Sequence, residues 1–252
     1  MAKSISEIRT IFQAATTNEL PSLIAEYEED ERSGVCTLVT RAKKQLDALE
    51  KEKERIYKLS EYERKYADCA LICGIDEVGR GPLAGPVVAG AVILPKDCQI
   101  LYINDSKKLS AEKREELDRV IRSEAVAIGI GEASPARIDE INILNATYEA
   151  MRQAIKVLGV TPDILLNDAV TIPEVSIRQV PIIKGDAKSI SIGAASIVAK
   201  VYRDRLMVEY DAQYPEYGFA SNKGYGAAAH IEALKTYGPT PIHRRSFIGN
   251  FL

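Results

Sequence analysis

The sequence predicts a mixed α/β fold that follows a separate helical segment. Short apolar runs rich in β-branched residues begin only after residue 70, and from about residue 130 they alternate with stretches of helical periodicity. Strands in succession, followed by strands that alternate with helices, are typical of a mixed sheet with helices against its faces. The first 70 of the 252 residues differ from the rest, with 12 Lys/Arg, 14 Asp/Glu and a single glycine.

The N-terminal segment has the pattern of amphipathic helix. Between residues 36 and 66, apolar side chains recur at spacings of three, four or seven, which is the spacing of one helix face: Leu46, Leu49, Ile56, Leu59, Tyr62 and Tyr66. The alternating charges of residues 51–55 are typical of a solvated helix surface. We therefore expect a helical extension over residues 1–70, which carries no residues with evident chemistry.

The remaining chain is expected to form one α/β domain over residues 71–212, with a helical C-terminal lobe over residues 213–252. The glycine and proline content of residues 79–86 predicts a loop between the first two strands. Ser134-Pro135 predicts the start of a helix that runs from residue 136 to 158, with proline at its first position. The expected strands are 71–75, 87–94, 125–131, 164–166 and 177–183, and further helices are expected at 189–210 and 225–236.

Composition sets limits on the class of protein. Hydrophobic residues make up 46% and charged residues 27%, which is ordinary for a globular protein. The longest nearly uncharged apolar stretch, residues 83–94, is much shorter than the ~20 residues of a membrane span, and the N-terminus has no apolar signal core. We expect a cytoplasmic protein with reduced thiols, because no second Cys pair or nearby His accompanies Cys69 and Cys73. The net charge of −3 leaves a nucleic-acid partner possible, since residues 184–252 contain nine Lys/Arg and six Asp/Glu.

Four carboxylates stand at the ends of predicted strands. Asp76 and Glu77 close the first strand, while Asp168 and Asp186 follow two later strands. Sites in open α/β sheets form at strand ends, and carboxylates that gather there repel one another unless a cation joins them. Hard oxygen ligands favour Mg²⁺ or Mn²⁺. The alternative for any one of these acids is a strand-end cap or a surface charge.

Adjacent strand residues point to opposite faces of a sheet. For Asp76 and Glu77 to reach one site, we expect the strand to end at Asp76, with an abrupt turn that the glycines at 79 and 81 make inexpensive.

Residues 74–88, with the sequence GIDEVGRGPLAGPVV, closely resemble the signature of bacterial ribonuclease HII. The resemblance covers about residues 71–247, and it continues through NDSKKL (104–109), IKGD (183–186), AASIVAKV (194–201), KGYG (223–226), His230 and His243-Arg244. The chain departs from the family pattern at Asn167, Gly193, Asn222 and Ala227. None of these departures removes one of the four acids or the Gly-Arg-Gly loop.

The resemblance implies a ribonuclease H-like fold and a two-metal endonuclease. It implies that Asp76, Glu77, Asp168 and Asp186 are catalytic and bind two divalent ions, Mn²⁺ or Mg²⁺. It also implies substrate contacts: the loop formed by Gly79, Arg80 and Gly81 at the ribose of an RNA–DNA junction, Arg80 on a phosphate, Tyr225 on the next sugar, and Lys107 and Lys200 on the backbone. The implied activity is hydrolysis of RNA in RNA–DNA hybrids and cleavage 5′ of single ribonucleotides in duplex DNA, leaving 3′-hydroxyl and 5′-phosphate ends. The implied roles are ribonucleotide excision repair and RNA primer removal.

Several of these residues have structural alternatives. Arg80 could pair with a local acid, and Tyr225 could pack in the core. Lys107 and Lys108 could form a solvated helix start near Ser110, and Lys200 could likewise lack a substrate role. His230 and His243 are interpreted as hydrogen-bonded structural residues, because metal-assisted catalysis needs no histidine base.

Three other functions stay open. The first is ribonuclease HIII, which cuts runs of ribonucleotides; the intact Gly-Arg-Gly loop and the lack of a longer sheet-like N-terminal module favour HII. The others are a non-catalytic hybrid-binding protein and a metal-dependent DNA nuclease.

We expect a monomer. The apolar, aromatic tail 246–252 has the look of a sliding-clamp-binding peptide, although helix-end packing is the preferred interpretation.

Overall fold

The computed structural model describes residues 3–252, and their contacts divide the chain into two compact units between Tyr57 and Lys58. The first unit is helical, with α1 (Ile5–Ala14), α2 (Leu20–Tyr27) and most of α3 (Ser33–Leu59). Its core is small and apolar: Ile8, Leu20, Ile24, Tyr27, Val35, Val39 and Ala42. Helix α1 begins with a capping box, in which Ser4 and Glu7 each accept a hydrogen bond from the other's backbone N–H.

The last helix of the expected N-terminal extension belongs to the second unit by its contacts. Helix α4 (Glu61–Lys65) is followed by Tyr66, and Tyr62 and Tyr66 pack against Leu166 and Ile192 of the α/β unit. Burial of these two aromatic rings explains why the division falls before α4 and not after it.

The second unit contains the predicted mixed sheet, with strand order β3-β2-β1-β4-β5. Strands β1 (Ile72–Val78), β2 (Val87–Ile93) and β3 (Ala127–Ala133) pair antiparallel, whereas β4 (Ile164–Asp168) and β5 (Arg178–Ile182) continue the sheet parallel to β1. The carboxyl ends of β1, β4 and β5 therefore lie along the same edge. The helices that flank the sheet are α5 (Ala111–Glu124), α6 (Pro135–Lys156) and α7 (Ile190–Gln213).

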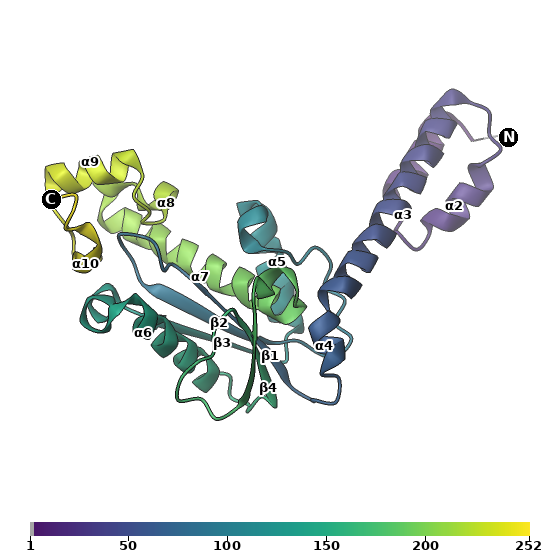
Figure 1. Ribbon diagram of the computed structural model, residues 1–252. Helices are drawn as coiled ribbons and strands as arrows, with labels where there is room; N and C mark the ends of the chain where they lie inside the picture. The colour runs from purple at the N-terminus through teal and green to yellow at the C-terminus, as the bar shows by residue number, and fades with distance from the viewer. Residues whose placement is uncertain (1–2) are drawn as a thin grey trace. The chain divides into compact units, whose positions relative to one another are not determined.

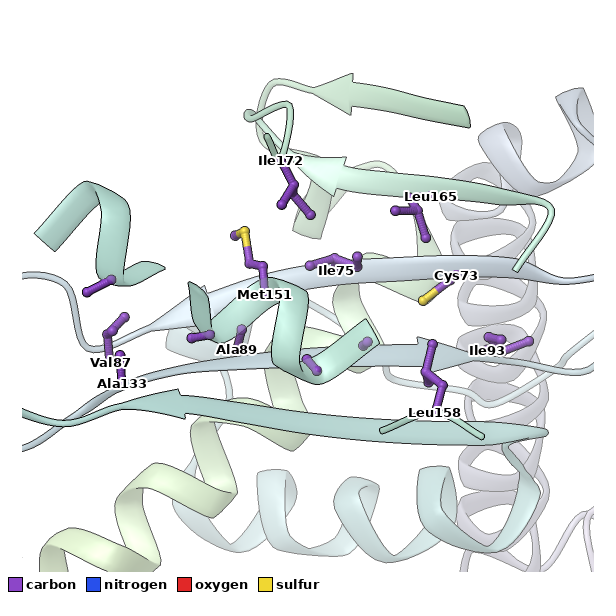
Figure 2. Packing of buried hydrophobic residues seen from close by; sticks show 14 of the residues in the cluster. Cys73, Ile75, Val87, Ala89, Ile93, Ala133, Met151, Leu158, Leu165 and Ile172 are labelled. Atoms are coloured by element: carbon purple, nitrogen blue, oxygen red, sulfur yellow. The ribbon is translucent and has the colours of Figure 1, made fainter. Parts of the chain in front are cut away.

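Helix α6 covers one face of the sheet and α7 covers the other (Figure 1). On the α6 face, Met151 packs over Ile75 and Leu165 within one apolar cluster (Figure 2). On the α7 face, backbones approach closely: a Cβ on Gly74 would stand 2.1 Å from the carbonyl carbon of Ser191. Glycine in β1 thus allows α7 to lie directly against the sheet.

Helix α6 was expected to be continuous but is broken at Asn142. Ser134 caps its start and Pro135 follows, as predicted. Asn142 then adopts a φ of 67° and a ψ of 163°, and its side-chain oxygen accepts hydrogen bonds from the N–H groups of Leu144 and Asn145. Asn142 thus breaks the helix and caps its second half.

The C-terminal lobe follows α7 and contains α8 (Phe219–Asn222), α9 (Ala228–Tyr237) and α10 (Arg245–Ile248), which gather at one end of α7 (Figure 1). Short 3-10 turns complete the unit at Ser106–Lys108, Gly185–Ala187 and Pro215–Tyr217. In the tail, Ile248 is buried, and Phe247 and Phe251 pack against the core of this lobe. Within residues 3–252, no helix combines the length and apolar character needed to cross a membrane.

Candidate active site

The structure corrects the expected end of the first strand. Strand β1 does not stop at Asp76 but continues to Val78, because β2 pairs with it through Glu77↔Ala89 and Val78↔Val88. Pairing with β4, in contrast, ends at Ile75↔Asn167. At Asp76 and Glu77 the edge of β1 toward β4 is therefore open. Side chains from the two faces of the strand can approach each other around that open edge.

The other two acids come from the neighbouring parallel segments. Asp168 is the last residue of β4, and Asp186 lies in the 3-10 turn Gly185–Ala187 that follows β5. The backbone N–H of Gly185 donates to Asp168 Oδ1 at 2.7 Å, which ties the turn to the end of β4. A left-handed Lys184, with φ of 58°, directs the chain into this turn.

Asp168 lies close enough to the other three carboxylates to raise their pKa values. Burial, the charge of Glu77 and the charge of Asp168 raise the pKa of Asp76 well above its usual range. Burial and Asp168 raise the pKa of Glu77, although Arg80 opposes the shift. Burial, together with Asp105 and Asp168, raises the pKa of Asp186. Burial and mutual repulsion together therefore disfavour the charged forms of Asp76, Glu77 and Asp186.

Asp76 is 7% exposed and is held by neighbours that sequence reasoning did not single out. Its Oδ1 accepts a hydrogen bond from the N–H of Glu77 at 2.8 Å, and its carboxylate accepts another from the Ser196 hydroxyl. Ser196 Oγ lies 2.9 Å from Ser106 Oγ. Either hydroxyl can be the donor in this pair. The only sequence signal for this pair of hydroxyls is a serine on the otherwise apolar face of α7.

Asp105 is a fifth acid of this region that the sequence analysis did not assign. Its charge helps to raise the pKa of Asp186, while its Oδ1 accepts a hydrogen bond from the N–H of Lys107. Across residues 3–252, no three histidine, cysteine or acidic side chains are drawn together tightly enough to hold a metal ion as they stand.

The Gly-Arg-Gly loop lies directly after β1, beside the acids. Gly79 has a φ of 90°, and a Cβ there would stand 2.3 Å from Arg203 Nε, so only glycine fits. Arg80 Nη1 lies 3.5 Å from Glu77 Oε1, with its side chain 46% exposed. The structure thus places Arg80 near a local acid, in a weak, solvated pair that leaves most of the guanidinium accessible.

Tyr225 comes to this loop from the C-terminal lobe. A Cβ on Gly81 would lie 3.8 Å from Tyr225 Cε1, and the tyrosine is 46% exposed. The core-packing alternative for Tyr225 is therefore wrong. Its ring stands at the surface beside an exposed glycine.

Two buried histidines fix the backbone at Tyr225, as the structural interpretation of both predicted. His243 Nδ1 accepts a hydrogen bond from the Thr240 N–H, so its Nε2 carries the proton and donates to His230 Nε2 at 3.0 Å. His230 Nδ1 then donates to the Tyr225 carbonyl at 2.8 Å. Both rings are neutral in this series of hydrogen bonds. Burial lowers the pKa of His243 to about 4.

The two predicted lysines differ in their surroundings. Lys107 is exposed, and its charge acts on both Glu77 and Asp186. Lys200 lies on α7 one turn beyond Ser196 and pairs with Asp204 at 2.7 Å. Ser110 caps α5 directly after the turn that contains Lys107, as the helix-start interpretation predicted. Asn167, a departure from the family pattern, is fully buried and donates to Gln179 Oε1 at 2.8 Å.

Comparison with known proteins identifies the family of this chain. The family model for ribonuclease HII matches residues 73–250, and that for the ribonuclease HII N-terminal domain matches residues 4–67. The chain belongs to the ribonuclease HII family. It is 68% identical over 224 residues to ribonuclease HII of Lachnoclostridium phytofermentans, covering 89% of this chain and 88% of the relative. It is 52% identical to ribonuclease HII of Clostridioides difficile over 252 residues, 99% of each chain. As a family member, it is a ribonuclease H-type hydrolase.

Solved structures agree on the fold of this ribonuclease HII chain. Ribonuclease H2 from Pyrococcus horikoshii matches with a TM-score of 0.58 and 29% identity, covering 70% of this chain and 93% of that one. The ribonuclease HII in a PCNA complex from Archaeoglobus fulgidus matches with a TM-score of 0.59 and 29% identity, covering 69% and 94%. A Bst-RNase HIII in complex with Mn²⁺ shares the fold at 17% identity and a TM-score of 0.55, covering 70% of this chain and 67% of that one.

Proposed function

We propose that this ribonuclease H cuts the RNA strand of RNA–DNA hybrids and cleaves 5′ of single ribonucleotides in duplex DNA, with two divalent ions. The observation that carries the proposal is the group of four acids at the carboxyl edge of β1, β4 and β5, in which Asp76, Glu77 and Asp186 have raised pKa values. A catalytic role for these acids explains why the fold maintains such repulsion.

The donor set fits Mg²⁺ or Mn²⁺. Every candidate ligand is a carboxylate oxygen, and Asp76 is buried without a cationic partner of its own among residues 3–252. Asp76, Glu77, Asp168 and Asp186 would hold the ions, which supply charge stabilisation for phosphodiester hydrolysis when bound. Ser196 and the Glu77 N–H orient the Asp76 carboxylate, and the Gly185 N–H orients Asp168. The Mn²⁺ complex of the ribonuclease HIII is in keeping with this chemistry.

The substrate side of the site is proposed to be the loop at Gly79–Gly81 with Tyr225. Backbone groups at an exposed glycine can reach a ribose 2′-hydroxyl, the group that distinguishes RNA from DNA. Arg80 is available for a phosphate, and Tyr225 offers an aromatic face to the adjacent sugar. Lys107 would add backbone contacts. Lys200 could do so only if its ion pair with Asp204 opens, so we propose it as the weakest of these contacts.

The test uses a DNA duplex with one ribonucleotide, incubated with Mg²⁺ or Mn²⁺. The wild-type chain is expected to cut only 5′ of the ribonucleotide, and Asp168→Asn is expected to abolish cutting. Asp163→Asn is the matched control, because Asp163 accepts hydrogen bonds from the N–H groups of Ala70 and Leu71, away from the site. It should cut like the wild type.

The metal is tested separately by thermal unfolding. Mg²⁺ or Mn²⁺ should raise the melting temperature of the wild type more than that of Asp168→Asn. Cutting only of runs of ribonucleotides would indicate ribonuclease HIII-like specificity. Cutting of all-DNA duplex would indicate a DNA nuclease, and no cutting of any duplex would leave a binding protein.

A further inference from the structure

Two fully buried arginines lie under the substrate loop. Arg203, on α7, and Arg244, just before α10, are each 0% exposed. Within residues 3–252, neither forms an ion pair with a carboxylate. A buried charge without a partner is costly unless hydrogen bonds replace its water. Both arginines therefore need acceptors, and main-chain carbonyls supply them, all but one from residues 79–86.

The acceptors are main-chain carbonyls, and the two arginines divide them. Arg244 donates through Nε to Gly85 O and through Nη1 to Arg80 O, each at 2.9 Å, and through Nη2 to Gly79 O. Arg203 donates to the carbonyls of Pro86, Ala84 and Lys223, at distances of 2.9–3.1 Å. Arg244 thus holds the two peptide units of the Gly-Arg-Gly sequence as well as Gly85, whereas Arg203 donates to none of the Gly-Arg-Gly carbonyls.

This arrangement sets the direction of two N–H groups. Residues 3–252 contain no cis peptide bond, and in a trans peptide unit the N–H points opposite to the C=O. The carbonyls of Gly79 and Arg80 point at Arg244, so the N–H groups of Arg80 and Gly81 point away from it. Neither N–H has an acceptor within residues 3–252. Both residues are exposed, and Tyr225 lies beside Gly81.

We propose that Arg244 is a positioning residue for ribonucleotide recognition: it fixes these two adjacent N–H groups so that they donate to the 2′-oxygen of the substrate ribose. The inference rests on the proposed function. Consecutive outward N–H groups form a concave donor site for an oxygen. The planar fork of arginine satisfies three carbonyls at once, which the single ammonium of lysine cannot reproduce with the same geometry.

The experiment compares Arg244→Lys with Arg203→Lys in the Asp168→Asn background, which prevents cleavage. Fluorescence anisotropy gives the dissociation constants for a duplex with one ribonucleotide and for the same all-DNA duplex, in Mg²⁺. Their ratio measures recognition of the 2′-hydroxyl. Arg244→Lys should reduce the ratio by about tenfold, as expected for the loss of one or two hydrogen bonds. Arg203→Lys should lower the melting temperature by a similar amount but keep the ratio.

The outcomes separate the inference from the function on which it rests. A parent ratio near one would overturn the proposed function, and the inference with it. A parent that discriminates, with an unchanged ratio in Arg244→Lys, would overturn the inference alone. If Arg244→Lys weakened binding of both duplexes equally, the N–H groups would bind a phosphate and not the 2′-oxygen. That result would also overturn the inference.

A second variant covers the case in which Arg244→Lys does not fold. Gly81→Pro removes one of the two N–H donors at an exposed position whose φ is not positive, without altering the core. It should also reduce the ratio, and an unchanged ratio would count against the donor site.

Discussion

The second unit contains two groups of charged side chains in largely buried settings. The two groups differ in how their charge is stabilised. At the carboxyl edge of β1, β4 and β5, a buried Asp76 lies with three other acids, and burial together with the charges of Glu77 and Asp168 raises its pKa. At the other group, beneath the loop of residues 79–86, Arg203 and Arg244 carry positive charge with no acid paired to them among residues 3–252, yet six carbonyl acceptors surround them.

The difference separates a site that awaits a ligand from a scaffold that is complete. Buried charges that are hydrogen-bonded to carbonyls of the same chain fix the geometry of the backbone around them. Carboxylates that repel one another are stabilised when a cation or a proton reduces their charge. The acid cluster and the arginine pair meet at the Gly-Arg-Gly loop, where the chain passes from one to the other.

The largest effect is expected from Asp76→Asn. Asparagine keeps an oxygen for the Glu77 N–H but removes the charge that Glu77 and Asp168 repel. Cleavage should fall by about 10³-fold, because losing several kcal/mol of transition-state stabilisation has that effect. The melting temperature of the metal-free protein should rise. Cleavage assays and thermal unfolding in EDTA measure the two effects.

The control for that prediction is Asp139→Asn. Asp139 accepts hydrogen bonds from the N–H groups of Arg245 and Ser246 and from the Ser246 hydroxyl, and these lower its pKa. Its loss should lower the melting temperature and spare cleavage. If Asp76→Asn also lowered the melting temperature of the metal-free protein, Asp76 would be stabilising in the absence of metal. The stated difference between the repelling acids and the hydrogen-bonded arginines would then be wrong.

A smaller effect is expected from pH, in the lobe that contains Arg244. Burial lowers the pKa of His243 to about 4, against 6.5 for an ordinary histidine. The unfolded chain therefore binds the proton more readily, so the contribution to stability is complete above pH 6.5 and is lost as pH falls toward 4. The loss should approach about 3 kcal/mol.

Urea unfolding at pH 7.5 and pH 4.5 measures this loss. His243→Gln, which does not titrate, should show a smaller difference between the two pH values than the wild type. An equal difference in both proteins would mean that His243 is not responsible.

The smallest effect is expected at Tyr225. This residue lies beside Gly81 and is buried neither among the acids nor with the two arginines. Tyr225→Ala should weaken binding of the ribonucleotide-containing duplex by about tenfold, at the lower end of what an aromatic stacking contact contributes. Tyr225→Phe should bind nearly as well, because it keeps the aromatic face. Neither variant should change the melting temperature much, since the side chain is 46% exposed. Anisotropy and thermal unfolding on the same samples test this, and a large loss of stability in Tyr225→Ala would contradict it.

Features that depend on neighbours along the chain could be predicted from the sequence. Apolar runs marked the five strands, Ser134-Pro135 marked the start of α6, and the motif at residues 74–88 indicated the family. These succeed because strand burial and helix capping are set by a few consecutive side chains.

Tertiary structure alone decided where β1 ends, where the helical extension separates, and what the buried arginines do. Pairing with β2 carries β1 past Asp76 to Val78, and packing of Tyr62 and Tyr66 draws α4 to the sheet. Arginine is ordinarily a surface residue in a sequence. Arg203 and Arg244 are buried because carbonyls from the distant segment 79–86 are turned toward them, and no local pattern encodes that meeting.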